Sequence, residues 1–120
     1  ATLHRIARDV ERNDLEAILS HVYSGAPDTL ALAQREFPRY SFERVNIKHN
    51  VEIVLDEGAH PPAADVTFNV RVDVTELASG IKHHVPRFVQ VTLRKEGGRW
   101  KVAQYSHDEP QASLRIRLDK

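Results

Sequence analysis

The chain has 120 residues, of which 17 are basic and 17 are acidic, so these charges cancel at pH 7. This length suits one domain, and the 41% share of hydrophobic residues argues against a wholly disordered chain. The balanced charge lacks the basic surplus that is typical of nucleic-acid-binding domains. The lack of cysteine excludes disulfides, thiolate zinc clusters and a thiol nucleophile.

The sequence leaves the cellular compartment open. No apolar run approaches the roughly 20 residues that span a bilayer, and no signal peptide is recognisable. The chain begins at Ala1 and contains no methionine, as expected if an initiator methionine was removed or if a domain was cut from a longer precursor. It is therefore compatible with a cytoplasmic protein and with the soluble part of an exported or anchored precursor.

The N-terminal third of the sequence predicts three short helices. The first has apolar residues at the i, i+3, i+4 and i+7 positions of one helical face, namely Leu3, Ile6, Ala7 and Val10. Asn13, with Glu16 three residues later, is typical of a capping box and predicts the start of the second helix. Asp28 is predicted to cap the third helix, and Pro38 to end it. We expect the three helices to cover a sheet.

From Phe42 onward the apolar residues recur with a period of two, which is typical of β-strands. One long strand is predicted to present Val45, Ile47, His49, Val51, Ile53 and Leu55 on a single face. After a loop that contains Gly and Pro, the next strand presents Val66, Phe68, Val70, Val72 and Val74. A two-residue turn at Ser79-Gly80 then pairs Val74 with Val85. This register keeps the apolar faces together, because a slip of one residue would turn every side chain to the other face.

The clearest local pattern is FVQVTLRKEGGRWKVAQYSHDEP, residues 88–110, in which Gly97-Gly98 separates two alternating runs. A glycine pair accepts the positive φ angles of a tight two-residue turn, so this stretch predicts a β-hairpin. The turn places Leu93 opposite Val102. Continued to the end of the strand, the same register turns three polar residues inward: Gln104, Ser106 and Asp108.

These strands predict one antiparallel meander with an apolar inner face and a mixed outer face. We expect a single domain over residues 1–120, with its core in residues 3–110 and a C-terminal tail at 111–120. The tail alternates Leu114, Ile116 and Leu118, so it is compatible with an edge strand or with a loose end.

The layout of short N-terminal helices followed by a long curved sheet is that of the cystatin-like cone fold. The run Gly97-Gly98-Arg99-Trp100-Lys101-Val102, followed by Tyr105, Ser106 and His107, resembles the last hairpin of the nuclear-transport-factor-2-like superfamily. Asn13-Asp14-Leu15-Glu16 resembles its helix break. The resemblance covers about residues 3 to 110.

The resemblance implies an α+β cone in which about three N-terminal helices pack on a curved antiparallel sheet. It also implies a cavity in most members and, in many, a dimer through the outer face of the sheet. It implies no particular reaction, because the same scaffold hosts isomerases, polyketide-cyclase-like enzymes and non-catalytic binding domains.

The predicted rows across the inner face become more polar toward one end, which we interpret as the mouth of the cone. His49, Arg87 and Asp108 would line this mouth, with Gln104 and Ser106 deeper inside and Tyr23 reaching in from the second helix. A guanidinium can hold a carboxylate with two hydrogen bonds, and Asp108 could orient His49 as a base. Alternatively, Arg87 and Asp108 form a plain cross-strand salt bridge, and His49 is a satisfied interior histidine.

Two known kinds of site fit this pattern poorly. A ketosteroid-isomerase-like reaction needs a carboxylate base and two oxyanion donors inside the cavity, whereas Asp65 and Asp73 are predicted to point outward. The pairs His83-His84 and His107-Asp108 suggest a metal, but neighbouring residues on a strand point to opposite faces and zinc-ligand spacing is absent. We therefore expect neither a metal nor a cofactor.

The outer face of the hairpin is predicted to carry Phe88, Tyr105 and His107 beside Arg71. Aromatic side chains gathered on the solvent side of a sheet can mark an interface, and the resemblance points the same way, to a homodimer. The alternative is that the C-terminal tail or loop residues cover this cluster.

Two functions remain in competition. The first is a non-catalytic domain that binds a small apolar or carboxylate-bearing ligand or a protein partner, as a homodimer. The second is a small isomerase, cyclase or lyase that uses His49 and Asp108. An enzyme predicts an open cavity that reaches His49, whereas a cone filled by Phe68, Trp100 and helix residues favours the binding domain.

Overall fold

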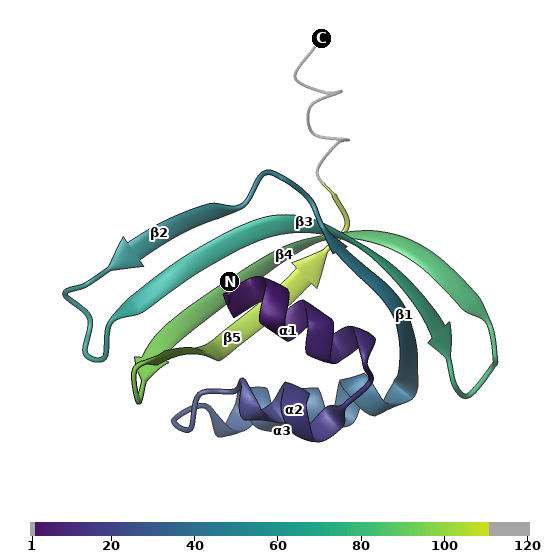
Figure 1. The fold of residues 1–120 in the computed structure, drawn as a ribbon, viewed down its shortest axis with the longest axis horizontal. Helices are drawn as coiled ribbons and strands as arrows, with labels where there is room; N and C mark the ends of the chain where they lie inside the picture. The colour runs from purple at the N-terminus through teal and green to yellow at the C-terminus, as the bar shows by residue number, and fades with distance from the viewer. Residues whose placement is uncertain (1, 111–120) are drawn as a thin grey trace, which may run out of the picture.

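The structure, a computed structural model, describes residues 2–110 as three α-helices followed by a curved antiparallel sheet of five strands (Figure 1). The helices are α1 (Thr2–Glu11), α2 (Leu15–Ser20) and α3 (Pro27–Glu36), and a 3-10 turn, η1 (Phe37–Arg39), follows α3. The strands are β1 (Tyr40–Ile47), β2 (Glu52–Asp56), β3 (Ala63–Glu76), β4 (Lys82–Glu96) and β5 (Arg99–Asp108). The predicted α+β cone is confirmed. No helix in this part of the chain is long and apolar enough to cross a membrane.

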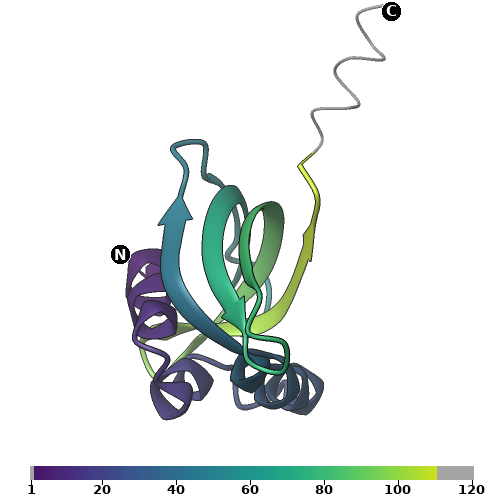
Figure 2. The ribbon, with the colours of Figure 1, turned by 90° about the vertical axis from the view of Figure 1, so that its right-hand side faces the viewer.

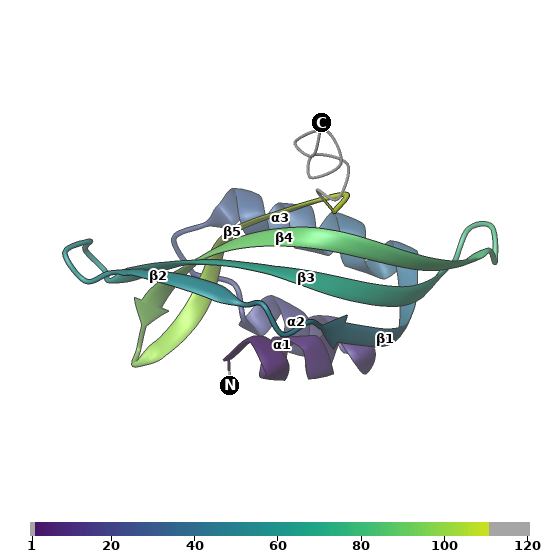
Figure 3. The same ribbon diagram turned by 90° about the horizontal axis from the view of Figure 1, so that it is seen from above.

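The helices lie together on one side of the sheet, whose helix-covered side we call the inner face (Figure 2). The strand order is β1-β3-β4-β5, and β2 pairs with the same edge of β3 as β1. Seen from above, β3 and β4 run the length of the molecule, with α3 on one side and α1 and α2 on the other (Figure 3). Helix α1 packs along β1 and α3 contacts β5. The helices therefore contact both edges of the sheet.

The starts of two helices differ from the prediction. Asp14, not Asn13, caps α2, and its side chain accepts a hydrogen bond from the backbone N–H of Ala17 at 3.1 Å. Asn13 has a positive φ of 55°, a backbone conformation that asparagine tolerates better than most residues. Helix α3 begins with Pro27 at its first position, without the predicted side-chain cap from Asp28. Proline suits this position because its missing N–H would have no helical partner.

The long first strand of the prediction is two strands. Tyr40–Ile47 pairs with the C-terminal half of β3, and Glu52–Asp56 pairs with its N-terminal half. Residues 48–51 between them lie outside any strand, and His49 in this connection is exposed. The alternation continues across the break, so hydrophobic periodicity alone could not reveal the interruption.

The turn between β3 and β4 is longer than predicted. The backbone N–H of Glu76 donates to the carbonyl of Ile81 at 2.9 Å, which leaves a four-residue loop in place of the two-residue turn at Ser79-Gly80. Val72 rather than Val74 therefore lies opposite Val85. The register moves by two residues, so each side chain keeps its predicted face.

The last hairpin turns at Gly97-Gly98 as predicted, with φ angles of 56° and 76°, and Leu93 lies opposite Val102. A β-bulge follows, because Ala103 is an extra residue between Val102 and Gln104. Beyond the bulge the predicted register is wrong by one residue. Side chains predicted to point inward therefore point outward, and the reverse.

The core lies between the helices and the middle of β3, β4 and β5. Its buried residues are Ala64, Val66, Phe68, Val70, Val91, Leu93 and Val102. Leu3, Ile6 and Trp100 pack against this cluster from its rim. Removing these side chains from water supplies about 25 cal/mol per Å² of apolar surface, which makes the cluster the main source of stability. The centre of the cone is filled by side chains of the strands and of α1.

The substitution Val66→Ala should lower the free energy of unfolding by about 2 kcal/mol, because it removes two methyl groups and leaves a cavity. Val66 is 2% exposed. The matched control is Val54→Ala on β2, where the side chain is 66% exposed, and it should change stability by less than about 0.5 kcal/mol. Urea unfolding curves measure both, and equal losses in the two variants would contradict this location of the core.

Candidate functional site

The bulge separates the residues that were predicted to line the mouth of the cone. Gln104, Ser106 and Asp108 lie opposite Thr92, Gln90 and Phe88 on the outer face, and all three are exposed. His49 is an exposed residue of the β1–β2 connection. No hydrogen bond or ion pair joins it to Asp108 within residues 2–110. The structure does not bring these residues together.

The remaining predicted ligand-binding residues lie in separate places. Arg87 lies in β4 opposite Val70, and its Nη1 donates to the carbonyl of the adjacent Pro86 at 2.9 Å. Tyr23 follows α2, and its backbone N–H donates to the carbonyl of Val102 at 2.8 Å. The predicted salt bridge between Arg87 and Asp108 is absent from the described part of the chain.

The proposed interface residues also divide between the two faces. Phe88 lies opposite Asn69 and Asp108 on the outer face, and Arg71 is exposed on the same face. Tyr105 lies opposite Val91, and His107 lies opposite Val89, in rows that belong to the inner face. The outer aromatic cluster of the prediction therefore retains only Phe88.

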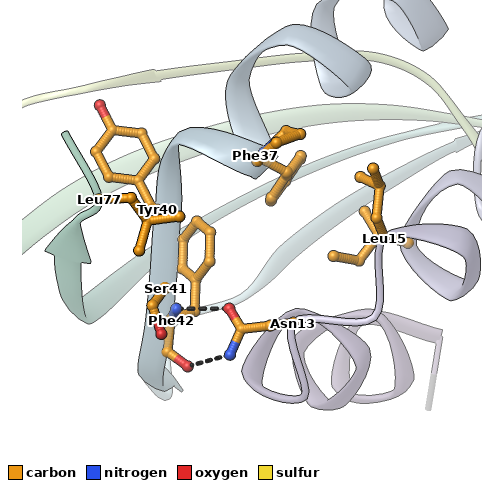
Figure 4. A pocket seen from close by; sticks show the side chains of 9 residues that line it. Asn13, Leu15, Phe37, Tyr40, Ser41, Phe42 and Leu77 are labelled. Carbon is orange, nitrogen blue, oxygen red and sulfur yellow. Dashed lines mark hydrogen bonds between the residues drawn. The ribbon is translucent and has the colours of Figure 1, made fainter.

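A cavity of about 420 Å³ opens beside the helices, between α2, η1 and the start of β1 (Figure 4). We call it the apolar pocket, since none of its lining residues carries a charge: Asn13, Leu15, Ile18, Phe37, Pro38, Tyr40, Ser41, Phe42 and Leu77. Leu77, from the β3–β4 loop, closes one side and is 59% exposed. The pocket thus lies where three connections between elements meet the side of α2 and the start of β1.

Asn13 fixes the wall formed by the α1–α2 connection. Its Nδ2 donates to the carbonyl of Phe42 at 3.0 Å, and its Oδ1 accepts from the backbone N–H of Phe42 at 2.7 Å (Figure 4). The two bonds join the loop to β1 in the manner of a strand pair. The side chain of Asn13 therefore shapes the pocket and has both its amide groups engaged.

The adjoining wall is a group of aromatic rings. The Phe37 and Phe42 ring centroids are 5.6 Å apart, and those of Tyr40 and Phe42 are 6.0 Å apart in an edge-on arrangement. The guanidinium of Arg39 lies 5.7 Å from the centroid of Tyr40 and 3.5 Å from a carboxylate oxygen of Glu36. Aromatic pairs at such distances attract one another beyond their buried area, so this wall is preorganised.

Tyr105 lies behind this wall, with its ring centroid 6.4 Å from that of Phe37. Its hydroxyl is buried and has no hydrogen-bond partner within the described residues. Burial raises the pKa of the Tyr105 phenol above its ordinary value of 10.0, and the charge of Glu36 raises it further while Arg35 opposes the shift. The neutral phenol is the form that this site favours.

The apolar pocket is suited to binding rather than to proton transfer. Its only titratable lining residue is Tyr40, and it contains no carboxylate, imidazole or amine. Its polar groups are the Ser41 and Tyr40 hydroxyls and the engaged amide of Asn13. Within residues 2–110 no group of three or more His, Cys, Asp or Glu side chains could hold a metal ion.

Sequence reasoning missed this pocket because its residues come from α2, from the start of β1 and from three connections, which lie far apart in the sequence. The one available signal was the aromatic run around Pro38, FPRYSF, in which Phe37, Tyr40 and Phe42 follow the end of a helix. For aromatic residues at the boundary between a helix and a strand, the sequence does not predict on which side of the sheet they lie, since periodicity does not extend across a turn.

Replacing Tyr105 by phenylalanine should raise the free energy of unfolding at pH 7 by about 1 kcal/mol, because the variant no longer buries an unpaired hydroxyl. The same variant should lose less stability in alkali. A phenol whose folded-state pKa exceeds its unfolded value contributes stability that is complete below about pH 10 and is lost as the pH rises through the folded-state value.

Denaturant unfolding at pH 7 and at several values above pH 9 measures both effects. Tyr40→Phe is the matched control, because Tyr40 lies at the edge of the same aromatic group and its hydroxyl is not among the buried unpaired atoms. It should change stability by less than about 0.5 kcal/mol. A clear loss of stability in Tyr105→Phe at pH 7 would show that the hydroxyl has a partner.

No protein-family model and no curated protein sequence matches this chain. Among solved structures, Aln2 from a Streptomyces species is similar with a TM-score of 0.67, over 96% of this chain and 90% of that chain, at 16% sequence identity. A nuclear transport factor 2 (NTF2-like) superfamily protein from Salmonella enterica serovar Typhimurium has a TM-score of 0.64, over 91% of this chain and 86% of that chain, at 10% identity. Likeness at such low identity concerns the fold, and it agrees with the resemblance seen in the sequence. The chain has the nuclear-transport-factor-2-like fold.

Proposed function

We propose that this chain is a non-catalytic binding domain that holds a small apolar ligand in the apolar pocket. The observation that carries the proposal is a cavity of about 420 Å³ lined by apolar and aromatic side chains, with a few hydroxyl groups and no charged residue. Small-molecule sites have this character: they are concave, mostly apolar, and contain a few polar groups that orient the ligand.

The size and the walls of the pocket define the ligand further. Typical ligand pockets measure roughly 300–1,000 Å³, so this one suits a molecule of one or two rings. The aromatic wall of Phe37, Tyr40 and Phe42 favours a flat ligand, since rings stack on rings. The hydroxyls of Ser41 and Tyr40 can bond a carbonyl or hydroxyl of the ligand. A charged group would lose its hydration there without a counter-charge, which disfavours ionic ligands.

The alternative enzyme, which would use His49 and Asp108, has no geometric support among the described residues. Asp108 lies on the outer face, opposite Phe88, while His49 lies beyond the end of β1. A base and the carboxylate that orients it must be within hydrogen-bond reach of each other. Three strand spacings, about 14 Å along the sheet, separate β1 from β5. We therefore favour binding over catalysis.

The substitution Leu77→Gln should weaken binding of N-phenyl-1-naphthylamine, a neutral apolar fluorophore, about fivefold. Leu77 is 59% exposed at the rim of the pocket, so a ligand would cover its side chain and gain part of the free energy of burying a leucine. Fluorescence titration measures the dissociation constant.

Ile81→Gln is the matched control, because Ile81 lies at the other end of the same loop, is 56% exposed and does not line the pocket. It should leave the affinity unchanged. Equal weakening in both variants, or no saturable binding to the wild-type chain, would contradict the proposed site.

We also propose that two copies associate through the outer face of the sheet. The helices cover only the inner face, so no described helix covers the outer face (Figure 2). Phe88 is an aromatic residue of this outer face. It lies between Asn69 of β3 and Asp108 at the end of β5. A large aromatic side chain surrounded by polar residues is typical of the centre of an interface.

Phe88→Glu should raise the dissociation constant of such a dimer at least about tenfold, because it buries an unpaired charge where an aromatic ring was. Sedimentation velocity over a range of concentrations measures the change. Ile81→Glu provides the control, because it adds the same charge in an exposed loop. A monomeric wild-type chain, or a dimer that Phe88→Glu leaves intact, would refute this interface.

A further inference from the structure

A second cavity, of about 160 Å³, lies at the opposite end of the α1–α2 pair from the apolar pocket. It is bounded by the start of α1, the end of α2 and the β4–β5 hairpin. Its lining residues are Thr2, Arg5, Ser20, His21, Gly98, Arg99, Trp100 and Lys101. None of them is acidic, and three are lysine or arginine. The two cavities share no residue, so this one requires its own explanation.

Two of the cations in this cavity have no ion-pair partner among the described residues. Glu96 lies opposite Arg99 in the hairpin, but its carboxylate is bonded by Ser24 and does not line the cavity. Arg5 and Arg99 form no ion pair and no side-chain hydrogen bond within residues 2–110. The lining thus holds three cationic side chains and no carboxylate, which favours a positive potential inside the cavity. The excess is local, because the acidic and basic residues of the chain are equal in number.

Lys101 is held at the same place by a hydrogen bond. Its Nζ donates to the carbonyl of Ser20 at 2.7 Å, near the C-terminus of α2. This bond uses one of the three ammonium protons and leaves the others free to contact a ligand. A cation at the end of a helix is also stabilising in itself. That structural role accounts for Lys101 but leaves Arg5 and Arg99 unexplained.

His21 is the most constrained side chain of the cavity. Its Nε2 lies 2.7 Å from Oδ2 of Asp9, and the two side chains are only 15% and 18% exposed. Its carbonyl accepts from the backbone N–H of Val102 at 2.7 Å, which fixes the main chain against β5. Because Asp9 engages Nε2, the ring orientation is set and Nδ1 is the nitrogen that remains for another partner.

We propose that this cavity is a binding site for a compact oxyanion that carries more than one negative charge, such as phosphate or the phosphate group of a monoester. Two guanidinium groups and an ammonium group can surround such an ion with charge-assisted hydrogen bonds. The Thr2 hydroxyl lines the same cavity and can donate to a further oxygen, whereas the Ser20 hydroxyl already donates to the carbonyl of Ala17 at 2.5 Å. Asp9 lies behind His21 and outside the lining, so its carboxylate is directed at the imidazole rather than at the ion.

Inorganic phosphate is the probe for this proposal, added at constant ionic strength and followed by amide and imidazole NMR shifts of the ¹⁵N-labelled chain. We expect saturable shifts centred on His21, Gly98 and Lys101. Arg99→Gln should weaken the affinity about tenfold, because a guanidinium contact to phosphate is lost. Arg99 is an exposed residue of a hairpin tip, so this substitution should leave the fold intact.

Arg44→Gln is the matched control, since Arg44 is an exposed arginine of β1 and does not line the cavity. It removes the same charge and should leave phosphate affinity within about twofold of the wild type. Equal weakening in the two variants would show general charge screening and overturn the proposal. Shifts that fail to saturate, or that centre on another part of the chain, would overturn it as well.

Two further titrations decide the chemistry of the ion. Phenyl phosphate should bind at least as well as phosphate if the site accepts monoesters, and weaker binding would restrict it to the free ion. Acetate should bind at least about tenfold more weakly, because a single charge gains less from three cations. Acetate binding as tight as that of phosphate would refute a site for multiply charged oxyanions.

Discussion

The helices are bonded to the sheet at the bulge of β5. The carbonyl of Val102 accepts from the backbone N–H of Tyr23, and the N–H of Val102 donates to the carbonyl of His21. The carbonyl of Ala103 accepts from the Thr29 hydroxyl at 2.7 Å. An extra residue in a strand leaves backbone groups without their ladder partners. Here α3 and the segment after α2 supply partners at that point. The bulge is therefore a junction between the two layers, and it sets the direction of every side chain that follows in β5.

Both cavities depend on this junction. On one side, the bulge turns Tyr105 inward, where its ring supports Phe37 and through it the wall of the apolar pocket. On the other side, the hydrogen bond from the N–H of Val102 to the carbonyl of His21 holds the imidazole at the second cavity. We call this the cationic cavity, because Arg5, Arg99 and Lys101 line it. One irregularity in one strand thus positions an uncharged site and a charged site at opposite ends of the same helix pair.

The two cavities differ in the kind of molecule that they can hold. The apolar pocket offers aromatic surface and a few hydroxyls, so burial of apolar area would provide most of its affinity. The cationic cavity is smaller and offers guanidinium and ammonium groups, so its affinity would depend on charge. A fold with a filled centre can still bind small molecules, because the gaps between its helices and strand ends remain available as sites.

Local patterns in the sequence determined the elements and most of their faces. Helical spacing in α1, period-two spacing from Phe42 onward and the glycine pair at Gly97-Gly98 predicted the helices, the sheet and the last turn. The loop before β4 was two residues longer than predicted, yet the faces of β3 and β4 stayed correct because a shift of two preserves them. Even the superfamily resemblance rested on these local features.

Only the tertiary structure decided the sites. After Val102 both alternating sets of residues contain polar side chains, so periodicity could not reveal the bulge at Ala103. The inward turn of Tyr105 is supported by its contact with Phe37, from a distant element. The pairing of His21 with Asp9 and the meeting of Asn13 with Phe42 likewise join segments whose neighbourhood no periodicity encodes. A local pattern specifies which residues share a face, whereas a cavity forms where unrelated segments pack together.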